Sequence, residues 1–280
     1  MKQIFFTLPV GGGLKIYGYG VMLAVAFFAS AGLASWRARR EKLDPLLLED
    51  LAFWMILGGL IGARAIFVWE YWRVKPWTFW SIFKIWEGGI VFYGSVLGGL
   101  ATFLLYRLVR PFPVRPVLDV IAPSLALGIA IGRIGCFLNG CCYGDRCDLP
   151  WGVSFPKGSL PYRDQLDDGL LAATRSWSLP VHPTQIYSAI DGFLLLGLLS
   201  AFYPRRRRDG EVMALLMVAY PVARFLIERL RNDEGVFAFG MTISQNISVL
   251  LLIAGLINWF VLSYWPKERY IDKAAPVEST

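Results

Sequence analysis

Three arginines stand inside long apolar stretches of this chain, where a charged side chain is costly to insert. Arg64, Arg133 and Arg224 each fall past the middle of such a stretch, and an arginine at the bilayer centre costs about 2.5–3.5 kcal/mol on insertion scales. A guanidinium stays charged and binds phosphate or carboxylate oxygens through two parallel hydrogen bonds. Three arginines at a similar depth therefore predict a pocket for an anionic lipid headgroup. The structural alternative is snorkelling or ion pairing, such as Arg64 with Glu70 or Arg224 with Glu228.

Other polar side chains are expected at the same membrane level, on the outer face. They are Tyr19, Glu87, Tyr93, His182, Glu228, Ser244 and Gln245. His182, the only histidine, lies in HPTQ just before an apolar stretch, where a structural hydrogen bond is the alternative to catalysis. Glu228 follows Arg224 by four residues, so both lie on one face of a helix. This pair is either purely structural or orients the guanidinium toward a ligand.

The sequence WEGGIVFYGSVLGG (86–99) places small residues at helical spacing. Membrane helices that pack closely against one another use this pattern. The adjacent glycines before Tyr93 also permit an unwound backbone at a site, because glycine adopts conformations that other residues avoid. Packing and a site both remain open for this segment.

The composition is that of a polytopic membrane protein. Of 280 residues, 56% are hydrophobic, and the mean hydropathy is +0.50. The net charge of +7 comes from short basic clusters at the ends of apolar runs, which are typical topology signals and headgroup anchors. Nucleic acid is therefore not expected as a partner. The opening MKQIFFTLPVGGG predicts no removable signal peptide.

An all-α fold follows, with about seven transmembrane helices. We predict them near residues 16–36, 51–72, 88–106, 117–138, 186–203, 212–230 and 246–265. The loops after the first, third and fifth spans and the C-terminal tail carry fourteen Lys and Arg, against seven in the other short segments. This places the N-terminus outside and the C-terminus inside. Residues 1–280 would form a single integral membrane domain, with an outer-face loop region at 139–185 and a cytoplasmic tail at 266–280.

All four cysteines fall in GRIGCFLNGCCYGDRC, which runs from residue 132 to 147. They are Cys136, Cys141, Cys142 and Cys147. Only the outer gaps of this C-x4-C-C-x4-C spacing fit the usual separation of zinc ligands. The predicted outer location is oxidising, which permits one or two disulfides. Disulfides, free packing thiols, and a metal-binding or reactive thiol stay open as alternatives.

Taken together and in chain order, YGYGVM, WEGGIVFYGSVLGG, GRIGCFLNG, HPTQIY and ARFLIERLR resemble the prolipoprotein diacylglyceryl transferase family. This family transfers the diacylglyceryl group of phosphatidylglycerol to the lipobox cysteine thiol of a prolipoprotein, forming a thioether and releasing glycerol phosphate. The resemblance implies a transferase of lipoprotein biosynthesis in the bacterial cell inner membrane, with its active site facing the outer leaflet. Its partners would be phosphatidylglycerol, the prolipoprotein signal peptide and membrane lipids. No metal or other cofactor is expected.

The resemblance also assigns roles to particular residues. Arg133 and Arg224 look like the two headgroup-binding, catalytically required arginines of the family. The further substrate-binding residues implied by position are Tyr19, Arg64, Asn139, Gly144, Gln185 and Glu228. Tyr93 or His182 would assist deprotonation of the thiol or orient the reacting groups.

The chain departs from the family pattern at several positions. Tyr93 stands where many members have histidine, and a phenol with a pKa of about 10 is a poor base for a thiol of about 8.5. Cys136 and Cys141 stand where asparagine and glutamate are usual, and Asp145 replaces an arginine. A relative that acts on another anionic lipid or thiol is therefore the main alternative. An anionic-solute transporter is less favoured, because no inverted repeat is apparent.

Overall fold

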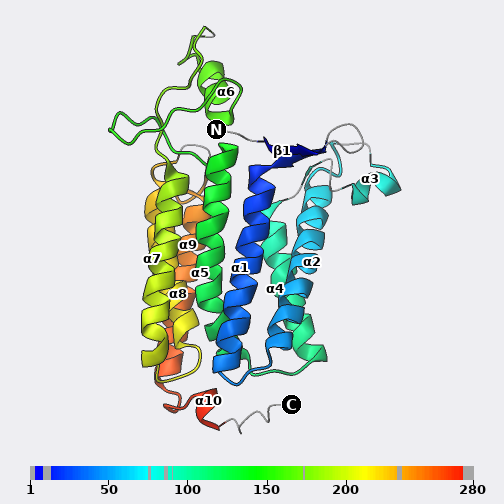
Figure 1. Ribbon diagram of the computed structural model, residues 1–280, viewed down its shortest axis with the longest axis vertical. Coiled ribbons are helices and arrows are strands. Elements are labelled where there is room, and N and C mark those ends of the chain that lie inside the picture. The colour runs from blue at the N-terminus through cyan, green and yellow to red at the C-terminus, as the bar shows by residue number, and fades with distance from the viewer. Residues whose placement is uncertain are drawn as a thin grey trace. The chain divides into compact units, whose positions relative to one another are not determined.

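The computed structural model describes residues 4–8, 14–74, 77–84, 88–89, 91–172, 174–231 and 235–273, with the side chains of 4–8, 14–16 and 92 left out. The principal helices are α1 (Gly18–Arg40), α2 (Pro45–Glu70), α4 (Phe92–Val109), α5 (Val114–Asn139), α7 (Thr184–Phe202), α8 (Glu211–Glu228) and α9 (Ile243–Ser263). Short helices are α3 (Phe79–Phe83), α6 (Leu160–Asp167), η2 (Tyr203–Arg205) and α10 (Tyr270–Lys273). The antiparallel strand pairs are β1 (Ile4–Leu8) with β2 (Leu14–Tyr17), and β3 (Val236–Ala238) with β4 (Met241–Thr242). The predicted all-α class is confirmed (Figure 1).

Each of the seven predicted spans falls on one of the principal helices. Among the described residues, five helices are long and apolar enough to cross a membrane: α1, α2, α5, α7 and α9. The helix α4 is apolar but shorter. The helix α8 has only eighteen residues, and three of them, Glu211, Arg224 and Glu228, are charged. A membrane protein is thus supported, and the count of seven spans stays a prediction.

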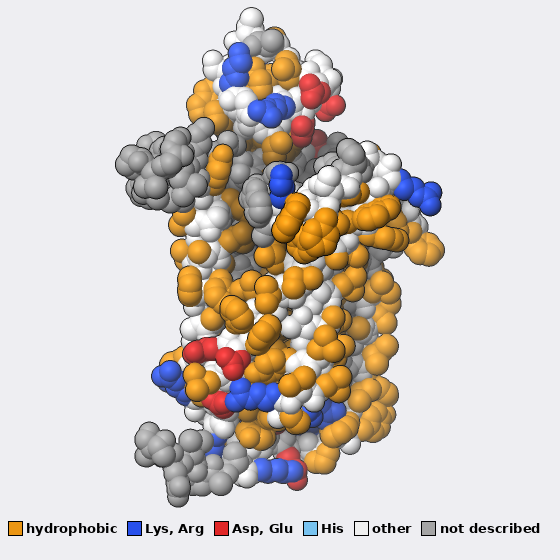
Figure 2. All heavy atoms as spheres, turned by 90° about the vertical axis from the view of Figure 1, so that its right-hand side faces the viewer, with side chains coloured by type: hydrophobic (Ala, Val, Ile, Leu, Met, Phe, Trp, Pro, Cys, Tyr) orange, Lys and Arg blue, Asp and Glu red, His pale blue; other side chains and the backbone are white. Residues whose placement is uncertain are grey.

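Large apolar side chains lie exposed along these helices. Examples are Phe28, Leu97, Leu194 and Leu226, which are between 58% and 71% exposed. On the face drawn in Figure 2, such side chains cover the helices. Exposed apolar surface of this extent is expected of helices that face lipid rather than water.

The chain forms two compact units. One comprises residues 1–34 and 118–273, and the other comprises 35–117 with 274–280, of which 274–280 lie outside the described residues. In the first unit, α5 approaches its neighbours through small residues. A Cβ built on Gly135 would lie 3.0 Å from Cβ of Met22 in α1, and one on Gly192 of α7 would lie 2.9 Å from Ala130. Because these positions are small, the helix backbones can come close enough for van der Waals packing.

A buried carboxylate fixes the start of α8 to α5. Asp119 is fully buried and accepts hydrogen bonds from the backbone N–H groups of Gly210, Val212 and Met213, at 2.7, 2.9 and 2.9 Å. The guanidinium of Arg206 lies 3.6 Å from the same carboxylate. Asp119 therefore satisfies N–H groups that the first turn of a helix leaves unpaired, and favours its positive end. This contact holds the first turn of α8 against α5.

In the second unit, α2 and α4 pack through glycines. A Cβ added at Gly62 or Gly94 would overlap the facing backbone, and Gly98 meets Gly58 in the same way. The prediction that residues 86–99 contain a helix-packing face is confirmed. Gly88 and Gly89 have φ values of 85° and 81°, so the chain is also unwound before the helix, as the sequence allowed.

Candidate active site

Arg133 lies in the penultimate turn of α5, and its guanidinium is not tied to the protein. Within the described part of the chain it makes no hydrogen bond and no ion pair. It interacts electrostatically with the Tyr19 phenol on α1 and with the Cys142 thiol. The Tyr19 ring reaches α5 because Gly135 has no side chain, and a Cβ there would lie 3.3 Å from that ring. The structure therefore brings Arg133 and Tyr19 together and leaves the guanidinium fork available to a ligand.

Arg224 is held in a fixed position by two partners. Its guanidinium lies 2.5 Å from the Glu228 carboxylate, one turn further along α8, and donates to the Ser244 hydroxyl at 3.0 Å. The Glu228 side chain is fully buried, whereas that of Arg224 keeps 12% of its surface exposed. Ser244, in the first turn of α9, was expected at this level. The pairing of Arg224 with Glu228 inferred from their spacing is present.

Arg231 is a further basic residue that sequence reasoning had counted only as a loop charge. Its guanidinium lies 3.7 Å from Glu228, and its side chain is 6% exposed. Two guanidinium groups thus share one carboxylate, so this cluster keeps a net positive charge. The turn that ends α8 brings the two residues together, because the Arg231 N–H donates to the Glu228 carbonyl at 3.0 Å.

The loop that follows α5 is fastened by residues from two distant segments. The Gly144 N–H donates to the His182 carbonyl at 2.8 Å, and the Asp145 N–H donates to the Leu230 carbonyl at 2.7 Å. A Cβ at Gly144 would lie 2.6 Å from that Leu230 oxygen, so only glycine fits without a shift. Gly144 was predicted to bind substrate. The structure gives it a positioning role, and its contact with substrate stays a prediction.

Two side chains of the HPTQ segment hold the same loop. Gln185 is fully buried and donates to the Cys141 carbonyl at 2.8 Å, and Thr184 donates to the Cys142 carbonyl at 2.7 Å. The role of this segment in the structure is thus to fix the position of the two adjacent cysteines. A direct contact of Gln185 with substrate is a prediction that its burial does not favour.

His182 has an aromatic partner. Its Nδ1 lies 3.3 Å from the Tyr187 hydroxyl, which accepts a hydrogen bond from Trp151 at 2.8 Å. The hydroxyl group of Tyr187 thus links His182 to Trp151, which lies earlier in the same 139–185 region. A catalytic role for His182 stays a prediction.

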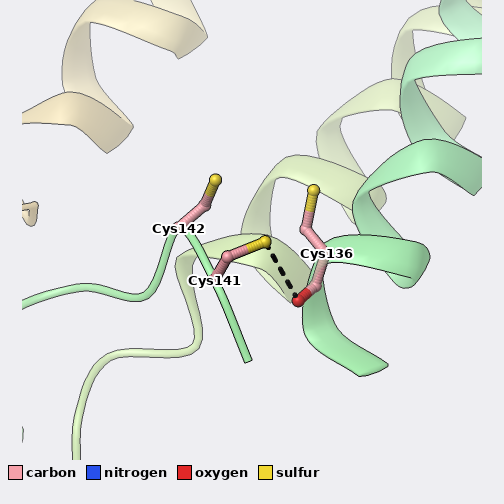
Figure 3. Close-up of side chains that lie close together, drawn as sticks. All are labelled: Cys136, Cys141 and Cys142. Carbon is pink, nitrogen blue, oxygen red and sulfur yellow. Dashed lines mark hydrogen bonds between the residues drawn. The ribbon is translucent and has the colours of Figure 1, made fainter. Parts of the chain in front are cut away.

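All four cysteines are free thiols in this structure. The sulfurs of Cys136, Cys141 and Cys142 lie within 4.8 Å of one another, and the Cys141 thiol lies 3.7 Å from the Cys136 carbonyl (Figure 3). Asn139, the last residue of α5, also hydrogen-bonds the Cys141 thiol. Cys147 is buried away from this group. Disulfides, one of the three alternatives, are therefore not formed here.

The three thiols lie in a positive field. Hydrogen bonds from the Cys136 and Cys141 thiols, together with the charges of Arg231 and Arg133, hold the pKa of Cys142 well below its usual range. Two guanidinium groups close to one loop favour any anion bound there, a thiolate or a phosphate alike. This field links the Arg133 region to the Arg224–Glu228–Arg231 cluster.

Arg64 and Tyr93 belong to the second unit. The Arg64 guanidinium donates to four backbone carbonyls, at 2.7–2.9 Å; these belong to Ser81, Ile82, Gly88 and Gly89. Its side chain is buried, and it has no carboxylate partner among the described residues, so the suggested pair with Glu70 is absent. These contacts give Arg64 the role of fixing the backbone at residues 81–82 and 88–89. Substrate binding by Arg64 stays a prediction that they do not favour.

Tyr93 is half-buried in the first turn of α4. Its role in catalysis stays a prediction. Glu87, expected at the same membrane level, lies outside the described residues.

Comparison with known proteins adds a family-level match. Residues 4–261 match the model of the family described as prolipoprotein diacylglyceryl transferase. A phosphatidylglycerol–prolipoprotein diacylglyceryl transferase of Clostridium tetani is 33% identical over 261 residues, which cover 91% of this chain and 96% of that protein. Proteins of the same name from Synechococcus elongatus and Thermotoga maritima are each 33% identical, over 98% and 92% of this chain and 92% and 86% of their own lengths.

Proposed function

The chain belongs to the prolipoprotein diacylglyceryl transferase family, and we propose that it transfers a diacylglyceryl group from phosphatidylglycerol to a prolipoprotein. The acceptor is the lipobox cysteine thiol that follows the signal peptide, and the products are a thioether and glycerol phosphate. The observation that carries the proposal at the level of the site is the unpaired guanidinium of Arg133 in a membrane helix. A charged side chain is costly to insert into the membrane, so its presence there indicates a function. A guanidinium without a protein partner is suited to bind the phosphate of an anionic lipid.

The two arginines would have different roles in the reaction. Arg133 binds the phosphate of phosphatidylglycerol through its free fork. Arg224, oriented by Glu228 and Ser244, stabilises the charge that gathers on the departing phosphate oxygen. Because Glu228 and Ser244 position the Arg224 guanidinium before substrate binds, little reorganisation of that group is needed when the charge develops.

The reaction requires an ionised acceptor thiol. The thiolate attacks the glycerol carbon that bears the phosphate, a C–S bond forms, and the C–O bond breaks with its electron pair on the phosphate oxygen. The thiol proton is released, with Tyr93 or His182 as the residues predicted to assist. Tyr19 and Asn139, which belong to the same unit as both arginines, would line the headgroup site.

The topology proposed for this chemistry is the seven-span arrangement, with the N-terminus outside the inner membrane. The excess of basic residues in alternate short loops supports this orientation. In the first unit, the 139–185 region follows the end of α5, the helix that carries Arg133, and leads into α7 (Figure 1). If that region faces outward, as proposed, the arginine site opens to the outer leaflet, and both substrates enter laterally from the bilayer. Residues 266–280 would then form the cytoplasmic tail.

A transfer assay tests the proposal. Membranes that carry the chain are incubated with phosphatidylglycerol labelled in its diacylglyceryl part and a lipobox peptide, and the label on the peptide is measured. We expect a labelled thioether with the cysteine peptide and none with a matched serine peptide. Full transfer by the Arg133→Ala, Arg224→Ala double variant would overturn the mechanism.

A further inference from the structure

Three thiols converge at the end of α5, on residues that the proposed mechanism does not use. The sulfurs of Cys136, in the last turn of the helix, and of Cys141 and Cys142, on the loop, all lie within 4.8 Å of one another (Figure 3). All three residues are half-buried, so the group is reachable from outside the protein. Three soft ligands this close together are the donor set of a thiophilic metal ion.

The backbone is shaped to bring these sulfurs together. Gly140 has a φ of 75° and Cys142 a φ of 58°, and the left-handed conformation is uncommon for a non-glycine residue. The Cys141 N–H still donates to the Cys136 carbonyl, at 3.2 Å, so the chain folds back on the helix end. The hydrogen bonds from Thr184 and Gln185 to the carbonyls of Cys142 and Cys141 hold this fold from the outside. The cluster is therefore fixed by residues distant in the sequence.

The distances fit zinc after a small adjustment. Zinc binds thiolate sulfur at about 2.3 Å, which places the sulfurs of a tetrahedral site about 3.8 Å apart. Rotation of half-buried side chains can close the separation of up to 4.8 Å. Three thiolates would give a bound Zn²⁺ a net charge of −1, which the nearby guanidinium groups of Arg133 and Arg231 offset.

We propose that Cys136, Cys141 and Cys142 bind one Zn²⁺, and that the open fourth position takes the acceptor cysteine thiol of the prolipoprotein. Catalytic zinc sites have three protein ligands and one exchangeable position, and a coordinated thiol is deprotonated. The role in thiol activation rests on the proposed function, whereas the metal site does not. Such activation suits a chain whose only histidine pairs with Tyr187.

The chemical step balances without a redox partner. The acceptor thiol gives its proton to solvent as it binds zinc. The bound thiolate then attacks the glycerol carbon of phosphatidylglycerol, so that a C–S bond forms and the C–O bond to phosphate breaks. The electron pair leaves on glycerol phosphate, and the thioether, a weaker ligand than the thiolate, dissociates from the metal.

Metal content tests the site independently of activity. The full-length protein is purified in detergent with a thiol reductant, and zinc is measured by mass spectrometry after dialysis. We expect about one zinc per chain, with loss of at least 80% of it in each of Cys136→Ser, Cys141→Ser and Cys142→Ser. Cys147→Ser, a buried cysteine outside the cluster, is the matched control and should retain its zinc. Thermal unfolding of every variant identifies any that fails to fold.

Replacement of zinc by Co²⁺ gives a second readout, because a cobalt–thiolate site has a strong near-ultraviolet charge-transfer band. Binding of Co²⁺ to the folded wild type without that band would overturn the three-thiolate site. A wild-type protein with no bound zinc, whether its thiols are free or joined in a disulfide, would do the same. Equal zinc in the wild type and in the folded triple serine variant would also overturn it.

Activity then tests the role of the metal. Zinc-stripped protein should transfer label to the lipobox peptide at least tenfold more slowly, and added Zn²⁺ should restore the rate. Unchanged transfer after complete zinc removal would overturn thiol activation. If zinc-loaded protein binds metal but never modifies the peptide, the proposed function fails while the metal site stands.

Discussion

The carboxylate of Glu228 is fully buried and lies 2.5 Å from the guanidinium of Arg224. Removing one member of a buried ion pair leaves the other charge without compensation, which costs about 3–5 kcal/mol in proteins. Here the carboxylate also neutralises Arg231, at 3.7 Å. The pair thus both stabilises the end of α8 and fixes the direction of a guanidinium that the mechanism requires.

Glu228→Gln keeps the shape of the side chain and removes its charge. We expect a lower melting temperature in detergent and a transfer rate reduced on the order of 100-fold, because Arg224 and Arg231 then repel one another and lose their fixed position. Both quantities are measured on the same preparation. Asp272→Asn, which removes an exposed pair with Arg269, is the control and should change neither. Wild-type transfer by Glu228→Gln would show that Arg224 needs no anchor.

Asp119→Ala tests the attachment of α8 to α5. The substitution leaves three backbone N–H groups and the Arg206 guanidinium without their buried acceptor, and each unsatisfied buried group costs about 1–3 kcal/mol. We expect a large fall in the melting temperature. Since Asp119 touches no residue of the proposed site, transfer per folded molecule at low temperature should remain within about twofold. A melting temperature equal to that of the wild type would contradict the capping role.

Gly144→Ala tests the fit of the loop. The added Cβ would lie 2.6 Å from the Leu230 carbonyl and 2.7 Å from Cβ of His182, so the loop must move away from both. We expect transfer to fall more than tenfold with a smaller change in the melting temperature. Gly197→Ala is the matched control, because a Cβ there meets nothing within 4 Å. In a helix interior that change should stabilise by about 0.5–1 kcal/mol and leave transfer unchanged.

These sites show which features of the structure can be predicted from the sequence alone. The positions of the helices and the packing face of residues 86–99 followed from hydropathy and from the spacing of small residues. The Arg224–Glu228 pair followed from helical periodicity, because it is local. In each case the information lies within one or two turns of a helix.

Contacts between distant segments could not be predicted in this way. One such contact joins the buried Gln185 to a carbonyl forty-four residues away, whereas its expected binding of substrate stays a prediction. The pair suggested for Arg64 with Glu70 is absent among the described residues, because the left-handed backbone at Gly88 and Gly89 presents carbonyls to the guanidinium; headgroup binding by Arg64 stays a prediction. Similarly, the close approach of three sulfurs depends on the positive φ of Cys142, which no spacing rule specifies.

Arg64→Lys tests whether this arginine fixes the backbone at residues 81–82 and 88–89. Lysine keeps the charge, but a single ammonium group cannot reach the four carbonyls that the planar guanidinium binds. We expect faster hydrogen exchange at residues 81–82 and 88–89 than in the wild type, together with a lower melting temperature. Arg73→Lys, at an exposed position just beyond α2, is the control and should leave both unchanged. If exchange at these four residues stayed at the wild-type rate while binding of phosphatidylglycerol fell, Arg64 would instead act on the headgroup, as first expected from the sequence.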